Sequence, residues 1–312
     1  ATLRENVVSL ARNIGYIPRS RTAAKAQVSF KLNLGTTEPS SNTVELTKGI
    51  VCVGSVNDSS FIFSISNNIA KQVEQEGNDY VANFDNLTIN QGTYLTKQFK
   101  FDNSLDQKFI LDNSFIDTST IHVYVKKENE SGLGYEYYIS DDITDIDSTS
   151  RVFFLQEVQD EKYEIRFGDG ILGKKLGSGT EQDGTIITVD YIVSDGVDGN
   201  GASSFSFSGN VINTVTESSI TLASSPVVTT ITKSEGGSNI EPIDSIKYYS
   251  PKIYSSQNRA VTPRDYEAII KRIYPETESV SVVGGEELNP PEFGTVQISI
   301  KPKFATYISD FT

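Results

Sequence analysis

The stretch FGDGILGKK, residues 167–175, is the part of the sequence that comes nearest to a nucleotide-binding motif. Gly168, Gly173 and Lys174 have the G-x-x-x-x-G-K spacing of a phosphate-binding loop, where the lysine contacts phosphate and the next hydroxyl holds magnesium. Here Lys175 replaces that hydroxyl, and further glycines stand where a helix would have to begin. The stretch therefore predicts a structural turn between two strands, and we expect no nucleotide cofactor.

The stretch SDGVDGNG, residues 194–201, could present oxygen ligands to a calcium ion through Asp195, Asp198 and Asn200. A calcium loop of the EF-hand type places oxygens at alternate positions, ends on a glutamate and lies between helices. Here the spacing is three and then two, and the flanking residues are typical of strands. We interpret this stretch as a turn as well, and predict no metal site.

Candidates for catalysis are few. The single cysteine, Cys52, lies in the strand-like run GIVCVGSV and is interpreted as a small buried side chain. The single histidine, His122, has no second histidine or nearby cysteine with which to bind zinc, and no G-x-S-x-G motif accompanies it. Acidic residues are plentiful, but a glycosidase needs a carboxylate pair within one cleft, and the sequence places none there. We predict no catalytic residues and no enzyme.

Composition narrows the class of partner. The formal charge of −14 argues against nucleic acid or an anionic membrane surface, because those partners require a basic patch. No run of about 18 apolar residues is present, so no membrane-spanning helix is expected. The first residues do not resemble a signal peptide. An apolar content of 37% over 312 residues is enough for two or three domains with ordinary cores.

The periodicity of apolar residues predicts a mainly β protein that begins and ends with helical elements. A helix is expected at the start, with one apolar face, ended by Gly15. Residues 27–34 alternate between polar and apolar as a half-buried strand does. Short strand-like runs separated by turns continue to about residue 235, and residues 233–244 are typical of a linker. The apolar face of the first helix comprises Leu3, Val7, Leu10, Ala11 and Ile14.

The last part of the chain predicts a small α+β module. Thr262 is in an N-cap position, Pro263 is the first helical residue and Asp265 completes a capping box. A stripe of apolar residues follows, and then come two strands. Helix, strand, loop and strand in this order suggest a ferredoxin-like unit. The stripe comprises Tyr266, Ile269, Ile270 and Ile273.

The predicted fold is therefore multidomain and mainly β with α+β parts, built from antiparallel sandwich-like or barrel-like modules and the small C-terminal α+β module. We expect four parts. They are residues 1–35, a helix and strand packing on the β core; 36–130, an antiparallel β domain; 131–235, a β-rich core containing the FGDG turn; and 245–312, the α+β module.

The glycine-rich turns resemble the baseplate J-like family of contractile-tail assemblies. The strand into F-G-D-G, the later glycines and the G-x-x-G-N turn all match, as do the A-V-T-x-x-D-Y helix start and a strand near the C-terminus. The matching turn residues are Gly168, Asp169, Gly170, Gly173, Gly184 to Tyr191, Gly196, Gly199 and Asn200. The matching helix and strand residues are Ala260, Val261, Thr262, Asp265, Tyr266, Gly294, Val296 and Ile298.

This resemblance implies a late structural protein of the virion, assembled in the host cytoplasm as part of the tail baseplate. It implies a wedge or inner-ring component that forms homodimers, binds other wedge and hub proteins, and passes on the trigger for sheath contraction. One alternative is a baseplate subunit of a non-viral contractile injection system. Another is a tail-associated carbohydrate-binding module, which the 15 tyrosines favour and the absence of tryptophan disfavours.

Overall fold

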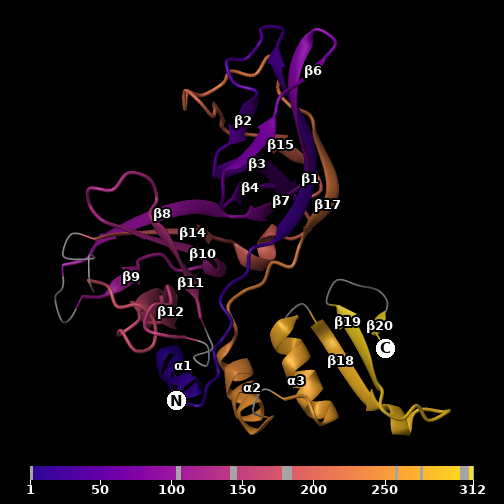
Figure 1. The fold of residues 1–312 in the computed structure, drawn as a ribbon. Coiled ribbons are helices and arrows are strands. Elements are labelled where there is room, and N and C mark those ends of the chain that lie inside the picture. Colours follow the sequence, from indigo (N-terminus) through magenta and orange to yellow (C-terminus); the bar gives the residue numbers. More distant parts are fainter. Residues whose placement is uncertain are drawn as a thin grey trace. The chain divides into compact units, whose positions relative to one another are not determined.

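The computed structural model describes residues 3–102, 107–140, 146–177, 185–256, 259–274, 277–302 and 309–311. The chain forms two compact units. We call residues Arg21–Asn239 the central unit, and Ala1–Ser20 together with Ile240–Thr312 the terminal unit. Figure 1 shows the chain with its helices and strands labelled.

The first part of the central unit, which we call the base module, is built around a sheet with the strand order β15-β3-β4-β7-β1-β17, in which β6 also pairs with β7. The strands of this sheet are β1 (Lys25–Gly35), β3 (Gly49–Val56), β4 (Ser59–Ile65), β6 (Glu74–Glu76), β7 (Asp79–Gln91), β15 (Phe205–Phe207) and β17 (Val228–Glu235). A smaller sheet has the order β16-β2-β5, with bounds Val211–Asn213, Thr43–Leu46 and Ile69–Gln72.

The core of the base module explains why its strands alternate. In β1, the side chains of Val28, Phe30 and Leu32 are buried, and the polar residues between them are more exposed. The ring of Phe30 stacks on that of Phe84 in β7, with 5.1 Å between centroids. The alternation predicted for residues 27–34 is thus confirmed. Cys52 is also buried in this core.

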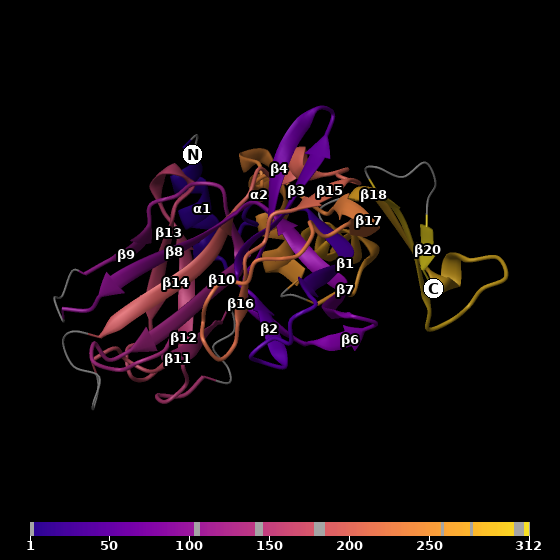
Figure 2. The ribbon, with the colours of Figure 1, turned by 90° about the horizontal axis from the view of Figure 1, so that it is seen from above.

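The second part, which we call the inserted module, is a barrel-like sheet with the order β8-β14-β10-β11-β12-β13-β9 (Figure 2). Strands β11 and β12 pair in parallel, and the other pairs are antiparallel. The strands are β8 (Thr93–Lys100), β9 (Phe109–Leu111), β10 (Ile116–Lys126), β11 (Tyr135–Ile139), β12 (Val152–Glu157), β13 (Tyr163–Phe167) and β14 (Ile186–Val193), with a 3₁₀ turn η1 (Gln159–Glu161). One core fills this sheet, and it includes Val123, Phe153, Ile165 and Val189.

The inserted module is joined to the base module by two neighbouring crossings of the chain. Strand β7 ends at Gln91 and β8 begins at Thr93, so that Gly92 alone lies between the two sheets. The chain returns after β14 through Ser194 and the 3₁₀ turn η2 (Gly196–Gly199). We call these two crossings the neck.

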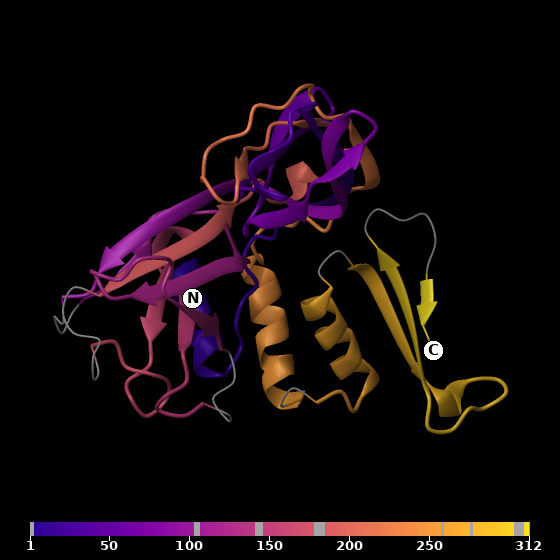
Figure 3. The same ribbon diagram turned by 45° about the horizontal axis from the view of Figure 1, so that its top comes forward.

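The terminal unit contains three helices and a three-stranded sheet among its described residues (Figure 3). The elements are α1 (Arg4–Asn13), α2 (Ile243–Ser256), α3 (Pro263–Ile273), β18 (Thr277–Gly284), the 3₁₀ turn η3 (Gly285–Glu287), β19 (Val296–Pro302) and β20 (Ser309–Phe311). The sheet order is β18-β19-β20, and α3 packs on β18. The α+β composition is as predicted, but a ferredoxin-like arrangement is not confirmed.

Packing in the terminal unit corrects two predicted helix faces. Helix α1 buries Val7, Val8 and Ala11 in a core that it shares with α2 and α3, whereas Leu10 is 60% exposed. Ile273, at the end of the predicted stripe on α3, is 76% exposed. Helix α2 was not expected, because Pro251 lies in its interior and the preceding residues are typical of a linker.

The fold as a whole is mostly β with barrel-like sheets, as predicted. The division into four parts, including the packing of the first segment on the β core, stays a prediction. No helix in the part of the chain that the structure describes is long and apolar enough to cross a membrane.

Candidate functional site

The glycine-rich loop after β13 uses its backbone amides inside the chain. Five consecutive amides donate hydrogen bonds to acceptors within the inserted module. The pairs are Gly170 N to Gly173 O (3.1 Å), Ile171 N and Leu172 N to Asp169 Oδ1 (2.8 and 2.9 Å), Gly173 N to Asp147 O (3.0 Å) and Lys174 N to Ser150 O (2.8 Å). A phosphate loop presents such amides to its ligand. This loop is therefore not built as a phosphate cradle.

Two glycines of the loop are required where its two limbs meet. A Cβ atom on Gly168 would lie 2.2 Å from the carbonyl of Gly173, so the two limbs approach as closely as the backbone permits. Gly173 itself has a φ of +84°, a conformation that glycine adopts without the steric cost of a side chain. The loop is closed by an isolated bridge between Gly168 and Lys175.

A short turn before β12 supplies the acceptors that hold the loop. Asp147 Oδ1 accepts hydrogen bonds from the Ser150 hydroxyl at 2.7 Å and from the amide and hydroxyl of Thr149, both at 2.9 Å. These hydrogen bonds, with that from Ser150 the largest, lower the pKa of Asp147 to about 2. Asp147 therefore stays charged well into the acid range. Its side-chain hydrogen bonds hold the turn, and the turn holds the carbonyls of Asp147 and Ser150 that fix the loop.

The second predicted turn lies in the neck. Gly196 has a φ of +67°, and a Cβ on Gly199 would lie 2.6 Å from the side chain of Gln91. Asn200 and Gly237 exchange two hydrogen bonds, both 2.8 Å, between the Asn200 amide group and the Gly237 backbone. The turn thus fastens the return crossing to the loop that follows β17.

Gln91 connects the two crossings of the neck. Its side chain is 1% exposed. Its Oε1 accepts from the Ser194 hydroxyl at 2.8 Å and from the Asp195 amide at 3.0 Å, and its Nε2 donates to Asp195 Oδ2 at 2.7 Å. Every polar atom of this buried amide group is therefore used between the end of β7 and the end of β14.

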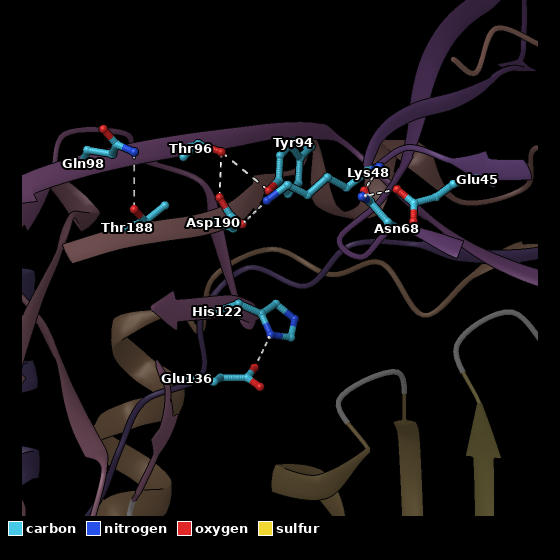
Figure 4. A network of polar contacts seen from close by, with 10 residues as sticks. All are labelled: Glu45, Lys48, Asn68, Tyr94, Thr96, Gln98, His122, Glu136, Thr188 and Asp190. Atoms are coloured by element: carbon cyan, nitrogen blue, oxygen red, sulfur yellow. Dashed lines mark hydrogen bonds and ion pairs between the residues drawn. The ribbon is translucent and has the colours of Figure 1, made fainter. Parts of the chain in front are cut away.

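An ion pair also crosses from the base module to the inserted module (Figure 4). Lys48 Nζ, in the loop between β2 and β3, donates to Asp190 Oδ2 of β14 at 2.6 Å. The Thr96 hydroxyl of β8 donates to the other oxygen, Oδ1, at 2.6 Å. Asp190 is 1% exposed, so this carboxylate is satisfied by its two partners rather than by bulk water.

The surroundings of this ion pair favour the protonated forms of Lys48 and Tyr94. Partial burial acts to lower the pKa of Lys48, but the hydrogen bonds to Asp190 and Tyr94 outweigh it, and the pKa is raised. Burial, followed by the contact with Asp190, raises the pKa of Tyr94 to about 12. Lys48 and Tyr94 therefore both keep their protons at neutral pH.

The predicted cap of α3 has reciprocal geometry. Thr262 Oγ1 accepts from the Asp265 amide at 3.3 Å, and Asp265 Oδ2 accepts from the Thr262 amide at 2.8 Å. The hydrogen bond from the Thr262 backbone is the main reason that the pKa of Asp265 is lowered. Two of the amides that a helix start leaves without helical partners are thereby satisfied.

The remaining candidate catalytic and metal-binding residues lie in surroundings that do not favour chemistry. Burial raises the pKa of Cys52 to about 12, which suppresses the reactive thiolate. His122 Nδ1 lies 3.2 Å from Glu136 Oε1 on the neighbouring strand. Asp195, Asp198 and Asn200 line an open cavity of about 470 Å³ beside the β3–β4 hairpin. Among the residues described, no three His, Cys, Asp or Glu side chains gather as metal ligands would. Gly184 lies outside the described residues.

Sequence reasoning predicted the turn in the neck but missed Gln91, Gly92 and both residues of the ion pair. Asp190 offered a signal, because a charged residue inside the otherwise apolar strand TIITVDYIV must be paired if it is buried. Lys48, Gln91 and Gly92 offered none, because their partners lie far away in sequence.

Two family models match the chain. The model described as "Bacteriophage baseplate wedge protein gp6, third domain" matches residues 94–193, and "Baseplate structural protein gp6, C-terminal domain I" matches residues 262–312. The first range coincides with the inserted module, whose strands run from Thr93 to Val193. The second begins at the N-cap of α3.

One curated relative agrees with these matches. The chain is 24% identical over 324 residues to baseplate wedge protein gp6 of Enterobacteria phage T4, covering 99% of this chain and 46% of that protein. It therefore spans less than half the length of this relative. The cryo-EM structure of the anti-feeding prophage baseplate is matched over 89% of this chain and 48% of that chain, at 14% identity and a TM-score of 0.29. That likeness is too slight to support conclusions.

The chain is thus similar to structural proteins of the baseplate, as the printed names of its matches describe them. Within that class it is gp6-like. The resemblance of the sequence to wedge protein six of T-even phages is confirmed as a gp6-like match.

Proposed function

We propose that this chain is a rigid wedge element that self-associates and binds neighbouring wedge and hub proteins to build the ring around the tail hub. It would pass on the trigger for sheath contraction through the contacts that hold its inserted module to its base module. The match of two gp6 domain models to separate parts of the chain supports this role. The proposal assigns the chain no catalytic step.

Exposed apolar side chains on the terminal unit carry the proposal of self-association. Val261, just before α3, is 77% exposed, and Ile273, its last residue, is 76% exposed. Phe293, in the loop before β19, is 82% exposed. Large apolar side chains that ordered elements keep exposed to solvent are typical of surfaces that a protein interface covers. We infer that they contact a second copy.

The neck supports the proposal of a transmitted trigger. The inserted module is connected to the base module by two crossings, and the contacts between the modules include the buried Gln91 and the Lys48–Asp190 ion pair. Because each of these contacts is directional, the two modules are held in one relation until the contacts break. A force applied to one module would therefore move the other with it.

Self-association can be tested with variants of matched exposure. Val261→Ser with Ile273→Ser removes apolar surface from the terminal unit. Val227→Ser with Ile171→Ser removes residues that are 83% and 76% exposed on the central unit. Analytical ultracentrifugation at micromolar concentration should show a discrete oligomer for the wild type and the second pair, and dissociation for the first. A strictly monomeric wild type, or equal weakening by both pairs, would contradict the proposal.

A further inference from the structure

A small pocket in the inserted module gathers positive charge. Its cavity of about 120 Å³ lies between the loop after β10, the start of β12 and the glycine-rich loop. Four of its lining side chains are cationic, Lys126, Lys127, Arg151 and Lys174, and one, Glu130, is acidic. The whole chain carries a formal charge of −14. The pocket is therefore positive within an acidic protein, and attracts anions locally.

The fold holds these cations in place. The Arg151 guanidinium lies over the ring of Tyr135, 4.1 Å from its centroid, which fixes the plane of its donors. Lys126 Nζ donates to the carbonyl of Gly132 at 2.8 Å. The amide of Lys174 is bonded to the residue before Arg151, so the glycine-rich loop and β12 bring these two residues together. The pocket is thus built from three segments of the module.

The chemistry of the pocket selects a carboxylate on an aliphatic stem. The ring of Tyr135, which is 51% exposed, supplies an apolar surface against which methylene groups can pack. Arg151 offers a planar pair of donors that matches a carboxylate. The loop amides that would be needed to enclose a phosphate already have partners inside the chain. We propose that this pocket binds the glutamate or aspartate side chains of an acidic peptide segment on a partner protein.

The acidic residue of the pocket is consistent with this assignment. Glu130 Oε2 accepts a hydrogen bond from the backbone amide of Lys127 at 3.2 Å, so its charge is directed to the loop backbone. The formal sum over the lining side chains remains positive. This pocket lies within the central unit, and the inference does not depend on the contact proposed for the terminal unit.

The test is binding of a fluorescein-labelled hexaglutamate peptide to the whole chain, followed by fluorescence anisotropy. Hexaglutamate should bind and a hexaglutamine peptide should not, and affinity should fall as salt rises. Lys127→Gln with Arg151→Gln should weaken binding at least tenfold. Lys25→Gln with Lys233→Gln is the matched control. It removes the same charge from exposed positions on β1 and β17 and should leave binding unchanged.

Three results would overturn the inference. They are absence of hexaglutamate binding at millimolar concentration, equal weakening by the two pairs of variants, and displacement of the peptide by inorganic phosphate at concentrations where acetate has no effect. Lys127→Gln alone is a second variant. Its side chain is exposed, so it tests the pocket without disturbing the Arg151–Tyr135 stack, and it should weaken binding severalfold with an unchanged melting temperature.

Discussion

Lys48 and Asp190 form an ion pair, 2.6 Å from Nζ to Oδ2, between residues that belong to different β modules and lie 142 positions apart in the sequence. Lys48 is 28% exposed at its side chain and Asp190 only 1%. The carboxylate therefore depends on its partners, whereas the ammonium group can still reach water. Because of this difference in burial, a substitution that leaves Asp190 without its partner should weaken the contact between the two modules strongly.

Removing the lysine should be costly. Lys48→Ala leaves Asp190 buried without its cationic partner, and we expect the free energy of unfolding to fall by about 2–3 kcal/mol. Lys48→Met combined with Asp190→Leu removes both charges and should recover most of this loss. Urea denaturation followed by far-UV circular dichroism measures both. If the double variant were less stable than Lys48→Ala, the explanation by an uncompensated charge would be wrong.

High pH should loosen the same junction. The pKa values of Lys48 and Tyr94 are raised in the folded chain, so folding favours their protonated forms. The contribution of Tyr94 is fully present below about pH 10 and is lost as pH rises through about 12, and that of Lys48 is lost as pH rises above its ordinary value of 10.5. The difference between wild-type and Tyr94→Phe absorbance titrations at 295 nm isolates the Tyr94 phenol. A midpoint near 10 in that difference curve would contradict the prediction.

The neck should not accept a side chain at Gly92. This glycine has a φ of +135°, and a Cβ would lie 2.4 Å from the carbonyl oxygen of Val193 on the return crossing. Gly92→Ala should therefore cost about 3–5 kcal/mol, from backbone strain and from displacement of the crossing. Gly77→Ala is the control. Its φ is +64° with open space around it, so it should cost about 1–2 kcal/mol by the same urea measurement.

The parts of this fold that sequence could predict are those that depend on neighbouring residues. Alternation in β1 follows from burial of one face, and the spacing of Thr262 and Asp265 is itself the pattern of a capped helix. The contact between the two crossings of the neck could not be predicted, because the hydrogen bond between Gln91 and Ser194 joins residues 103 positions apart. Helix α2 was missed because local propensity, with Pro251 inside it, was overridden by burial of Ile246 and Ile253.

In the glycine-rich loop as well, the local conformation could be predicted from the sequence and the distant contacts could not. The glycines that replace a helix start predicted a turn from local chemistry alone. Which acceptors satisfy its amides depends on Asp147 and Ser150, which the sheet brings to the loop from an earlier segment. The cationic pocket likewise depends on strand pairing, since Lys126, Arg151 and Lys174 come from three segments.

The cap of α3 should respond to acid. The pKa of Asp265 is lowered in the folded chain, so its contribution is present above its ordinary value of 3.8 and is lost as pH falls below it. Thr262→Ala should cost about 1 kcal/mol of helix stability at neutral pH. Hydrogen exchange of the amides of α3 reports both effects. Unchanged exchange in Thr262→Ala would show that packing on β18, and not the cap, fixes the helix start.

Two alanine substitutions in the glycine-rich loop should separate close approach from backbone conformation. Gly168→Ala places a Cβ 2.2 Å from the Gly173 carbonyl, so the limbs must part, at a cost of about 2–3 kcal/mol. In Gly170→Ala, the new Cβ has only the Cβ of Lys175 within contact distance, at 3.6 Å. The cost in stability, about 1–2 kcal/mol, comes from the φ of +95°.

Exchange of the loop amides distinguishes the two variants. Parting the limbs in Gly168→Ala should release the amides of Gly173 and Lys174 from their acceptors, and exchange over residues 168–175 should accelerate strongly. Gly170→Ala should keep those bonds and exchange nearly as the wild type does. Because the Lys174 amide bond also positions that residue in the cationic pocket, Gly168→Ala should weaken hexaglutamate binding and Gly170→Ala should not. Equal exchange in both variants would mean that the contact of Gly168 with Gly173 does not hold the loop closed.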